Sequence, residues 1–373
     1  PILTPSLDLA LVGNCTIGAL IDRQNRIVVV GTTLIGSPQS ASLQVLRLTP
    51  AGDRDGSFNG GTGNNGIVAY GFGPSAANRI IAVALMPNDD LVSAADLDQG
   101  NGDIILQRIS GSNGTPVTTW GDGFGFKIVD LQPSANAARD TVIGLAALPD
   151  GRLLVVSMLD RKLMRLDATG LAVAADLSGL AAFPCNDMVV DASGRAYIGN
   201  FGFDIFVRPV EPRPTVLAMV APDGKVSVAA DDVLFPNGAV ITPDGCTMIL
   251  AETFGRRLTA FDIASDGTLA NRRLWADLDN IAPDGICLDA EGAVWVASPR
   301  SNEFVRVLQG GRIAQRIASS QQGIACALGG ADGRTLFMVS GRVRSHAESL
   351  AERAGRIDAV RVDVPAAPPP RCL

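Results

Sequence analysis

The stretch IGLAALPDGRLLVVS (residues 143–157) contains two apolar runs that are separated by Pro-Asp-Gly. Such a tripeptide favours a tight turn, because Asp accepts hydrogen bonds from nearby backbone amides and Gly tolerates a positive φ. Short runs rich in Val, Leu and Ile on both sides of a turn are typical of β-strands. The stretch therefore predicts a β-hairpin.

The same hairpin pattern recurs seven times along the chain. The copies span residues 17–31, 81–96, 143–157, 186–200, 237–252, 284–298 and 322–340. Two further strand-like runs follow most copies, so that a unit has four strands in roughly 40 to 50 residues, which is typical of a propeller blade. The sequence predicts one all-β domain, a β-propeller over residues 1–373, with seven blades favoured and six as the alternative.

The two ends of the chain are expected to close the ring. The last unit supplies GRIDAVRVDV (355–364) as its third strand, and the proline-rich PAAPPPR (365–371) that follows cannot continue a ladder. We expect LDLALVG (7–13) to supply the missing strand. This closure would bring Cys15 and Cys372 together, and a disulfide between them is a further expectation.

Composition narrows the classes of function. A chain of 373 residues with net charge −7, no cluster of Lys and Arg and 5% aromatic residues is a poor match for nucleic acid. No apolar run reaches the ~18 residues of a membrane span. Six cysteines without a C-x-x-C pair, and a single histidine, argue against a Cys/His zinc site. Because the chain begins with Pro1, we expect a removed leader and a periplasmic or secreted location, with a cytoplasmic one as the alternative.

In a propeller the first strands line a central channel, and their first residues gather at one mouth of it. Alignment of the seven hairpins on their turns places there Ile17, Ile81, Ile143, Asn186, Asn237, Asp284 and Gln322. One carboxylate with amide oxygens and no soft ligand suits a hard cation such as Ca²⁺, Mg²⁺ or Mn²⁺. Asn or Asp before Gly also fits ordinary turn chemistry, but recurrence in three successive units favours a site.

Four stretches carry a resemblance to a known family. They are PCNDMVVDASGRAYIGNFGFD (184–204), FPNGAVITPDGCTMILAETFGRRLTAFDIASDGTLANRRLWA (235–276), APDGICLDAEGAVWVASP (282–299) and ACALGGADGRTLFMVSG (325–341). In this order they resemble the senescence marker protein, gluconolactonase and luciferin-regenerating enzyme family, over roughly residues 140 to 362. The resemblance implies a β-propeller with one divalent cation, commonly calcium, at the channel mouth, and hydrolysis of sugar lactones, other lactones or related esters.

The resemblance also implies roles for single residues. By motif, Asn237 is similar to the metal-binding asparagine, Asp284 to the aspartate that binds metal and acts as base, and Asn186 to the asparagine on the substrate side. The family's glutamate ligand has no counterpart in this chain. Its candidate replacements lie at the ends of second strands and are Asp96, Asp98 and Asp160.

The first part of the chain differs from the family. LQVLRLTPAGDRDGSFNGGTGNNGIV (43–68) resembles the delta-sixty repeat, another β repeat of the propeller type. The chain is therefore interpreted as two such blades over residues 1–139, followed by five gluconolactonase-like blades over residues 140–373.

The polar insertion SGRVRSHAESLAERAGR (340–356) is expected on the same face as Asp284. His346 in this insertion is a candidate catalytic residue, as a proton shuttle on a lid. Arg342 and Arg344 are candidates for binding an anionic substrate, as is Gln322 for binding substrate in the ring. A solvated surface loop is the plain alternative for His346 and the two arginines.

Three functions follow from these observations. The first is a hydrolase that opens a lactone, with Asp284 and Asn237 holding a cation, Asp284 helping to deprotonate water and Asn186 orienting the substrate. The second is a metal-independent ring-opening enzyme, isomerase or lyase with an apolar pocket. The third is a propeller that binds a ligand or protein without catalysis, since a fold alone does not determine a function.

Overall fold

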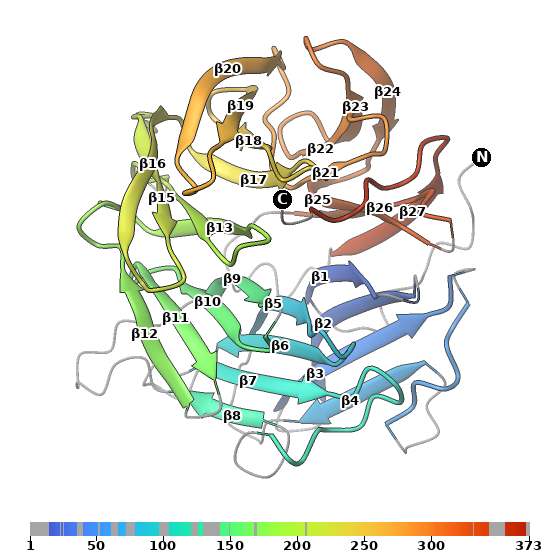
Figure 1. The fold of residues 1–373 in the computed structure, drawn as a ribbon. Helices are drawn as coiled ribbons and strands as arrows, with labels where there is room; N and C mark the ends of the chain where they lie inside the picture. The colour runs from blue at the N-terminus through green and yellow to red at the C-terminus, as the bar shows by residue number, and fades with distance from the viewer. Residues whose placement is uncertain are drawn as a thin grey trace.

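The chain forms seven antiparallel sheets arranged in a ring in the computed structural model (Figure 1). The structure describes residues 15–22, 24, 26–35, 40–50, 53–60, 66–71, 79–96, 104–120, 126–129, 142–148, 150–167, 170–205, 207–330, 332–342 and 355–370. Six sheets have four strands, and the last has three strands within these residues. In each sheet the strands follow one another in chain order, as in the blades of a propeller.

The first three blades contain β1 (Cys15–Ile21), β2 (Ile27–Ile35), β3 (Ser40–Leu48), β4 (Ile67–Gly71), β5 (Arg79–Leu85), β6 (Leu91–Asp96), β7 (Ile104–Ile109), β8 (Phe126–Val129), β9 (Val142–Ala147), β10 (Leu153–Ser157), β11 (Lys162–Asp167) and β12 (Gly170–Asp176). The last four contain β13 (Cys185–Val190), β14 (Ala196–Asn200), β15 (Thr215–Val220), β16 (Val226–Val233), β17 (Pro236–Ile241), β18 (Thr247–Glu252), β19 (Arg257–Ile263), β20 (Leu269–Asp277), β21 (Ile286–Leu288), β22 (Val294–Ser298), β23 (Glu303–Val307), β24 (Ile313–Ala318), β25 (Gln322–Gly329), β26 (Thr335–Gly341) and β27 (Arg356–Arg361).

The first strands of the blades form the inner wall of the ring. Each contacts the first strand of the next blade, and β25 of the last blade contacts β1 of the first, so that the ring is closed. The prediction of seven blades is confirmed. The segment LDLALVG, which was expected to complete the last blade, lies outside the described residues, as does Cys372 of the expected Cys15–Cys372 disulfide.

The hairpin turns form as the sequence predicts. In the turn after β21, the Asp289 carboxylate accepts hydrogen bonds from the backbone amides of Glu291 and Ala293, at 3.0 Å each. Gly292 has a φ of 78°, a conformation that glycine adopts without the steric cost that a Cβ brings. Arg306 of β23 donates to the same carboxylate at 2.6 Å, so that one aspartate ties the turn to the neighbouring strand.

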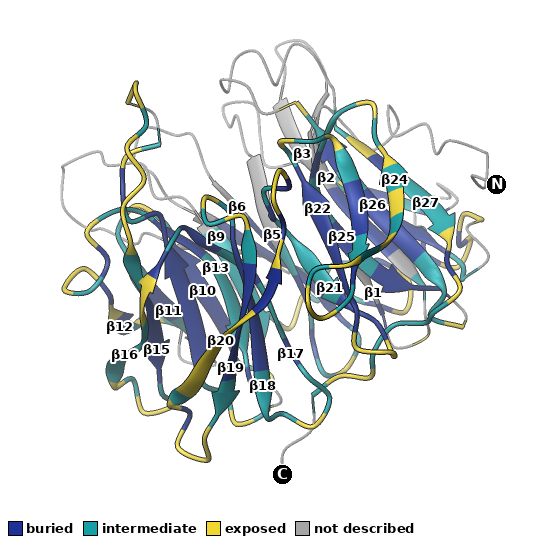
Figure 2. Cartoon of the chain, turned by 90° about the horizontal axis from the view of Figure 1, so that it is seen from above, coloured by how far each residue is buried: buried dark blue, intermediate teal, exposed yellow. Residues whose placement is uncertain are grey.

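The hydrophobic core lies between the blades. Every residue of the second strands β10, β14 and β22 is buried, because neighbouring blades cover both faces of a sheet. The outer strand β24 instead alternates between half-buried and exposed residues. Figure 2 shows this gradient, with buried strands inside and exposed stretches on β20, β24 and the loops.

Contacts between the blades extend to the cysteines. The sulfur atoms of Cys287 on β21 and Cys326 on β25 lie 3.7 Å apart across the junction of blades 6 and 7.

Among the residues that the structure describes, no helix is long and apolar enough to span a bilayer.

Candidate functional site

A β-bulge marks the start of the first strands. The strand register shifts by one residue at or beside Ile17, Ile81, Ile143, Asn186–Asp187, Asn237–Gly238 and Ile324. In the sixth blade, Asp284 and Gly285 both pair with Ala297, at 3.0 Å each. A bulge redirects the side chains at its own position. The aligned positions of the sequence thus coincide with bulges, except in the last blade, where Gln322 precedes the extra residue Ile324 by two positions.

The glycines in Asn237-Gly238 and Asp284-Gly285 are required by close packing between blades. A Cβ on Gly238 would lie 2.7 Å from the carbonyl oxygen of Asp284, and a Cβ on Gly285 would lie 2.8 Å from the Cα of Ala325. Neither glycine has a positive φ. Turn chemistry therefore does not explain these Asn-Gly and Asp-Gly pairs. Close contact between the blades explains them and brings Asn237 and Asp284 together.

Thr253 holds Asn237 in place. The Asn237 Nδ2 donates to Thr253 Oγ1 at 3.0 Å, and Thr253 Oγ1 donates to the carbonyl oxygen of Pro283 at 2.7 Å. Pro283 directly precedes Asp284, so one hydroxyl links the blades that carry the two polar groups. Because the amide nitrogen of Asn237 is used in this contact, its Oδ1 is left to accept a hydrogen bond or to bind a cation.

Asp284 is half-buried at the channel wall. Burial raises the pKa of its carboxyl to about 8, the charge of Asp187 raises this pKa further, and a hydrogen bond from Asn237 partly opposes the shift. Asp284 is therefore an acid that takes up a proton at neutral pH unless a positive charge compensates it. A carboxyl with its pKa near 7 is suited to accepting and returning a proton.

Asp187 is a second channel carboxylate, which the sequence analysis missed. It is half-buried, and burial raises its pKa to about 6. It occupies the bulge position at which blades 5 and 6 carry Gly238 and Gly285. A carboxylate where the neighbouring units have glycine is the signal in the sequence that marks this residue.

Asn186 is buried in the wall between blades 4 and 5. Its Nδ2 donates to the carbonyl oxygen of Pro236 at 3.1 Å, directly before Asn237. The side chain therefore joins the two first strands. Its role in orienting substrate stays a prediction.

Of the remaining candidate catalytic and substrate-binding residues, the structure describes Gln322 and Arg342. Gln322 is half-buried and is the first residue of β25, whereas Arg342 is exposed just beyond β26. His346 and Arg344 lie outside the described residues.

The candidate replacements for the missing glutamate lie at the ends of second strands, as expected. Asp160 is half-buried beyond β10 and accepts a hydrogen bond from Ser157 at 2.9 Å. Asp96 is the last residue of β6, but its side chain is not among those described, and Asp98 lies outside the described residues.

The donor set fits a hard divalent cation. Two carboxylates, Asp187 and Asp284, and the amide oxygen of Asn237 are oxygen donors of the kind that Ca²⁺ and Mg²⁺ prefer. Within the described residues, neither carboxylate forms an ion pair with Arg or Lys. A group of three or more His, Cys, Asp or Glu side chains arranged for a metal ion is absent from the same part of the chain. A cation at this site would therefore be bound by the two carboxylates together with amide or backbone oxygens.

Glu252, the last residue of β18, secures the loop before Asn237. The side chain is fully buried and accepts hydrogen bonds from the Leu234 amide at 2.7 Å, from Arg257 at 2.7 and 2.9 Å, and from Thr259. Burial opposes ionisation, but these hydrogen bonds outweigh it and lower the pKa of Glu252. The carboxylate is thus structural and stays charged.

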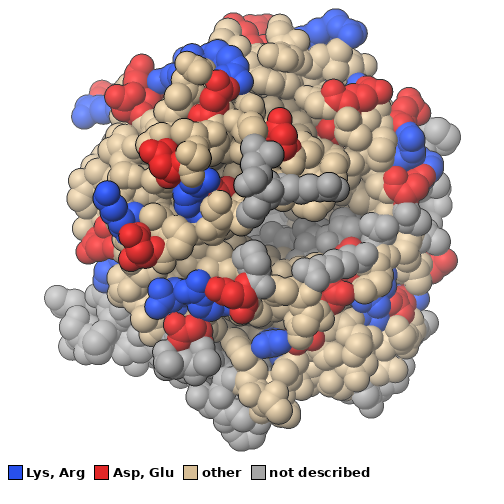
Figure 3. Space-filling view, in the orientation of Figure 1, with Lys and Arg blue, Asp and Glu red and all other residues tan. Residues whose placement is uncertain are grey.

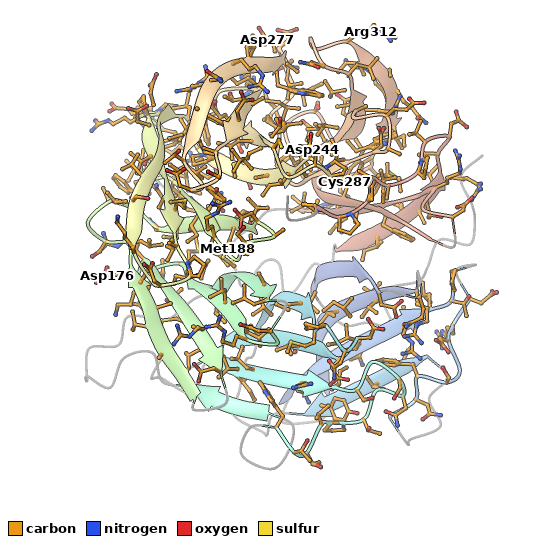
Figure 4. All side chains as sticks on the ribbon, in the orientation of Figure 1. Asp176, Met188, Asp244, Asp277, Cys287 and Arg312 are labelled. Atoms are coloured by element: carbon orange, nitrogen blue, oxygen red, sulfur yellow. The ribbon has the colours of Figure 1, made fainter. Side chains whose placement is uncertain are left out.

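The molecule is hollowed at the centre of the ring, and its charged side chains lie mainly around the periphery (Figure 3). Met188 and Cys287, which lie close to Asp187 and Asp284 in the chain, belong to first strands near the centre of the ring, whereas Asp277 and Arg312 lie at the outer rim (Figure 4). A separate cavity of about 210 Å³ lies between the hairpin turns of blades 3 and 4, lined by Asp150 among others, and contains none of these site residues.

The chain is similar to a known protein family and to characterised members of it. Residues 115–342 match the model of the family described as SMP-30/Gluconolactonase/LRE-like region. Regucalcin from Danio rerio is 30% identical over 173 residues, which cover 45% of this chain and 58% of that protein. The 6-deoxy-6-sulfogluconolactonase from Pseudomonas putida is 28% identical over 186 residues, or 48% of this chain and 62% of that protein. The chain thus spans about three fifths of the length of the curated relatives it matches.

Two solved structures show the same fold. One is described as a calcium-binding protein, regucalcin, from Agrobacterium tumefaciens, and has a TM-score of 0.55 and 21% identity over 79% of this chain and 94% of that one. The other is virginiamycin B lyase from Staphylococcus aureus, with a TM-score of 0.60 and 11% identity over 94% of this chain and 96% of that one.

Proposed function

Because the chain belongs to the SMP-30/gluconolactonase/LRE-like family, we propose that it is a hydrolase that opens a lactone or a related cyclic ester at a divalent-cation site, with calcium the preferred cation. The supporting observation is the pair of half-buried carboxylates, Asp187 and Asp284, beside the amide of Asn237. The charge of Asp187 raises the pKa of Asp284, and a cation bound by both carboxylates would relieve this repulsion. The relatives include a gluconolactonase and a calcium-binding protein, which supports both parts of the proposal.

In the proposed reaction, Asp284, Asp187 and the Oδ1 of Asn237 would hold the cation. A bound divalent cation would polarise the lactone carbonyl and keep both carboxylates ionised. Asp284 accepts a proton from the water that attacks the carbonyl carbon. When the ring C–O bond breaks, the protonated Asp284 returns this proton to the departing ring oxygen. The product is the open hydroxy acid, and Asp284 is again ionised.

A pH-stat assay tests the proposed function directly. With calcium present, we expect the purified protein to hydrolyse at least one lactone of a panel that includes D-glucono-1,5-lactone and δ-valerolactone, more than about 10³-fold faster than buffer alone. A calcium chelator should abolish the rate and added calcium should restore it. Calcium at about 100 times its dissociation constant should stabilise the fold by about 2.7 kcal/mol. No acceleration with Ca²⁺, Mg²⁺, Mn²⁺ or Zn²⁺ would overturn the proposal.

Thr253 is proposed as a positioning residue, because its hydroxyl contacts both Asn237 and the residue before Asp284. We expect Thr253→Val to weaken calcium affinity about 10-fold or more, since partners that orient a ligand commonly contribute this much. Thr253→Ser keeps the hydroxyl and should retain the affinity. Titration calorimetry with calcium measures both variants. Equal weakening in Val and Ser would show that the hydroxyl alone does not position Asn237, because Ser keeps the hydroxyl and would still lose affinity.

A further inference from the structure

Four phenylalanines pack together beside the carboxylate pair. The ring centroids of Phe201 and Phe235 are 4.8 Å apart, those of Phe203 and Phe254 are 4.9 Å apart, and those of Phe235 and Phe254 are 5.2 Å apart. Phe201, Phe203 and Phe235 are buried, whereas Phe254 is 37% exposed. Such distances are those of favourable aromatic pairs, so the four rings stabilise one another.

The cluster lies at the channel mouth. Phe235 precedes Asn237 by two residues, and Phe254 directly follows Thr253, the partner of Asn237. On the neighbouring blade, Phe201 follows Asn200, which pairs with Cys185 just before the bulge that carries Asp187. The phenylalanines therefore border blades 4 and 5 at the same end as the site.

Apolar side chains continue from this cluster into solvent. Six large hydrophobic residues are exposed in the part of the chain that the structure describes, namely Leu159, Val173, Val207, Val228, Phe254 and Leu274. Val173, Val228 and Leu274 lie on the outermost strands β12, β16 and β20. The other three lie in or beside the phenylalanine cluster. Phe254 belongs to the cluster, and Leu159 follows Met158, which packs against the cluster. Val207 belongs to the β14–β15 loop, which carries Phe201 and Phe203.

Grouped exposed apolar side chains next to a polar site are typical of a ligand-binding surface. Leu159 and Val207 lie on loops whose residues Met158 and Ile205 pack against the phenylalanine cluster, whereas the polar donors Asp187, Asn237 and Asp284 lie at the starts of first strands. A ligand that uses both parts has one polar end and one hydrocarbon end.

We propose that this protein takes lactones that bear a hydrocarbon substituent, which packs against Phe254, Leu159 and Val207 while the ring carbonyl lies at the carboxylate pair. The inference rests on the proposed function for its reaction and on the aromatic cluster for its substrate class. A polyhydroxylated sugar lactone would place hydroxyl groups against these apolar side chains, where they would lose hydrogen bonds to water.

Two lactones that differ only in the substituent test the proposal. We expect kcat/KM for δ-decalactone, which bears a pentyl chain, to exceed that for δ-valerolactone by about 10-fold or more, since added methylenes in an apolar pocket give discrimination of this order. Phe254→Ala should reduce this ratio toward one. Leu159→Ser changes a 42% exposed residue on a different loop, so that it tests the same surface with little risk to folding. Leu274→Ala, 62% exposed on the outer strand β20, is the control and should keep the wild-type ratio.

Each outcome decides the proposal. A wild-type ratio of one or less, or a ratio that neither Phe254→Ala nor Leu159→Ser changes, would overturn the substrate class while leaving lactone hydrolysis intact. Hydrolysis of D-glucono-1,5-lactone but of neither test lactone would also overturn the substrate class. If no lactone of the panel is hydrolysed, the proposed function fails, and thermal shift on binding then tests the apolar surface. A melting-temperature rise with δ-decalactone that exceeds the rise with δ-valerolactone and is lost in Phe254→Ala would support the surface. Equal or absent rises would overturn it.

Discussion

Asp284→Asn is expected to lower kcat/KM for lactone hydrolysis by about 10³-fold or more, because the amide can neither accept the proton of the attacking water nor supply a negative charge to a cation. The same change is expected to stabilise the cation-free protein at alkaline pH. The reason is the proximity of Asp187, whose charge raises the pKa of Asp284. Removing one of two like charges removes their repulsion.

The direction of the stability effect follows from the two pKa values. In the folded protein the pKa is about 8 for Asp284 and about 6 for Asp187, both above the unfolded value of about 3.9. Between these limits the folded state binds more protons than the unfolded state, so the free energy of unfolding of the wild type decreases as pH rises from about 4 to 8. In Asp284→Asn the decrease should be smaller and should end near pH 6.

Thermal melts in chelator from pH 4 to pH 9 measure this effect. We expect equal melting temperatures for wild type and Asp284→Asn near pH 4, and a higher one for the variant at pH 9, by about 3 °C or more. Asp231→Asn removes an exposed carboxylate from β16 and is the matched control, with no change expected in activity or in the melting profile. An Asp284→Asn protein that retains wild-type activity would show that Asp284 is not the base.

Glu252→Ala is expected to reduce the free energy of unfolding by about 3 kcal/mol, because it leaves the Leu234 amide and the Thr259 hydroxyl without their buried acceptor and leaves Arg257 without its partner. The loop before Asn237 loses its anchor, so that a loss of calcium affinity should accompany the loss of stability. The melting temperature should fall by about 5 °C at neutral pH.

A control and a pH series sharpen this prediction. Glu211 also pairs with an arginine, Arg213, at 3.1 Å, but both side chains are largely exposed, so Glu211→Ala should cost less than about 1 kcal/mol. Since hydrogen bonds lower the pKa of Glu252 below its unfolded value, the stabilisation is present above about pH 4.3 and is lost as pH falls through the folded pKa. The difference between wild type and Glu252→Gln should therefore shrink below pH 4. Equal costs for Glu211→Ala and Glu252→Ala would contradict the argument.

Much of the fold could be predicted from local chemistry. The period of apolar runs and Asp-Gly turns predicted seven hairpins, and each became the first two strands of a blade. Asp289 and Gly292 show why this works, since a side-chain acceptor and a permissive φ form the turn without help from distant residues. The residues at the channel mouth were also predictable, because the first strands of all blades begin at the same end of the ring.

The candidate site was predictable only in part. Asn237 and Asp284 were identified by their repeated position. Asp187 was missed because alignment on the turns does not detect the bulge in blade 4, which spans both Asn186 and Asp187. The reason for Gly238 and Gly285 was also missed, since the close approach of neighbouring blades comes from residues far apart in the chain.

The strand repeats and the turns follow from local sequence, because each depends on residues within about 40 positions of one another, and the motifs within these repeats carry the family resemblance. Which charges share the channel, and which apolar loops border it, depends instead on how the blades close into a ring. Asp187 and Asp284 are almost one hundred residues apart, and their coupling exists only because a closed ring brings first strands of different blades to one mouth. The pKa of a buried carboxyl depends on that three-dimensional neighbourhood, so it cannot be derived from neighbours in the sequence.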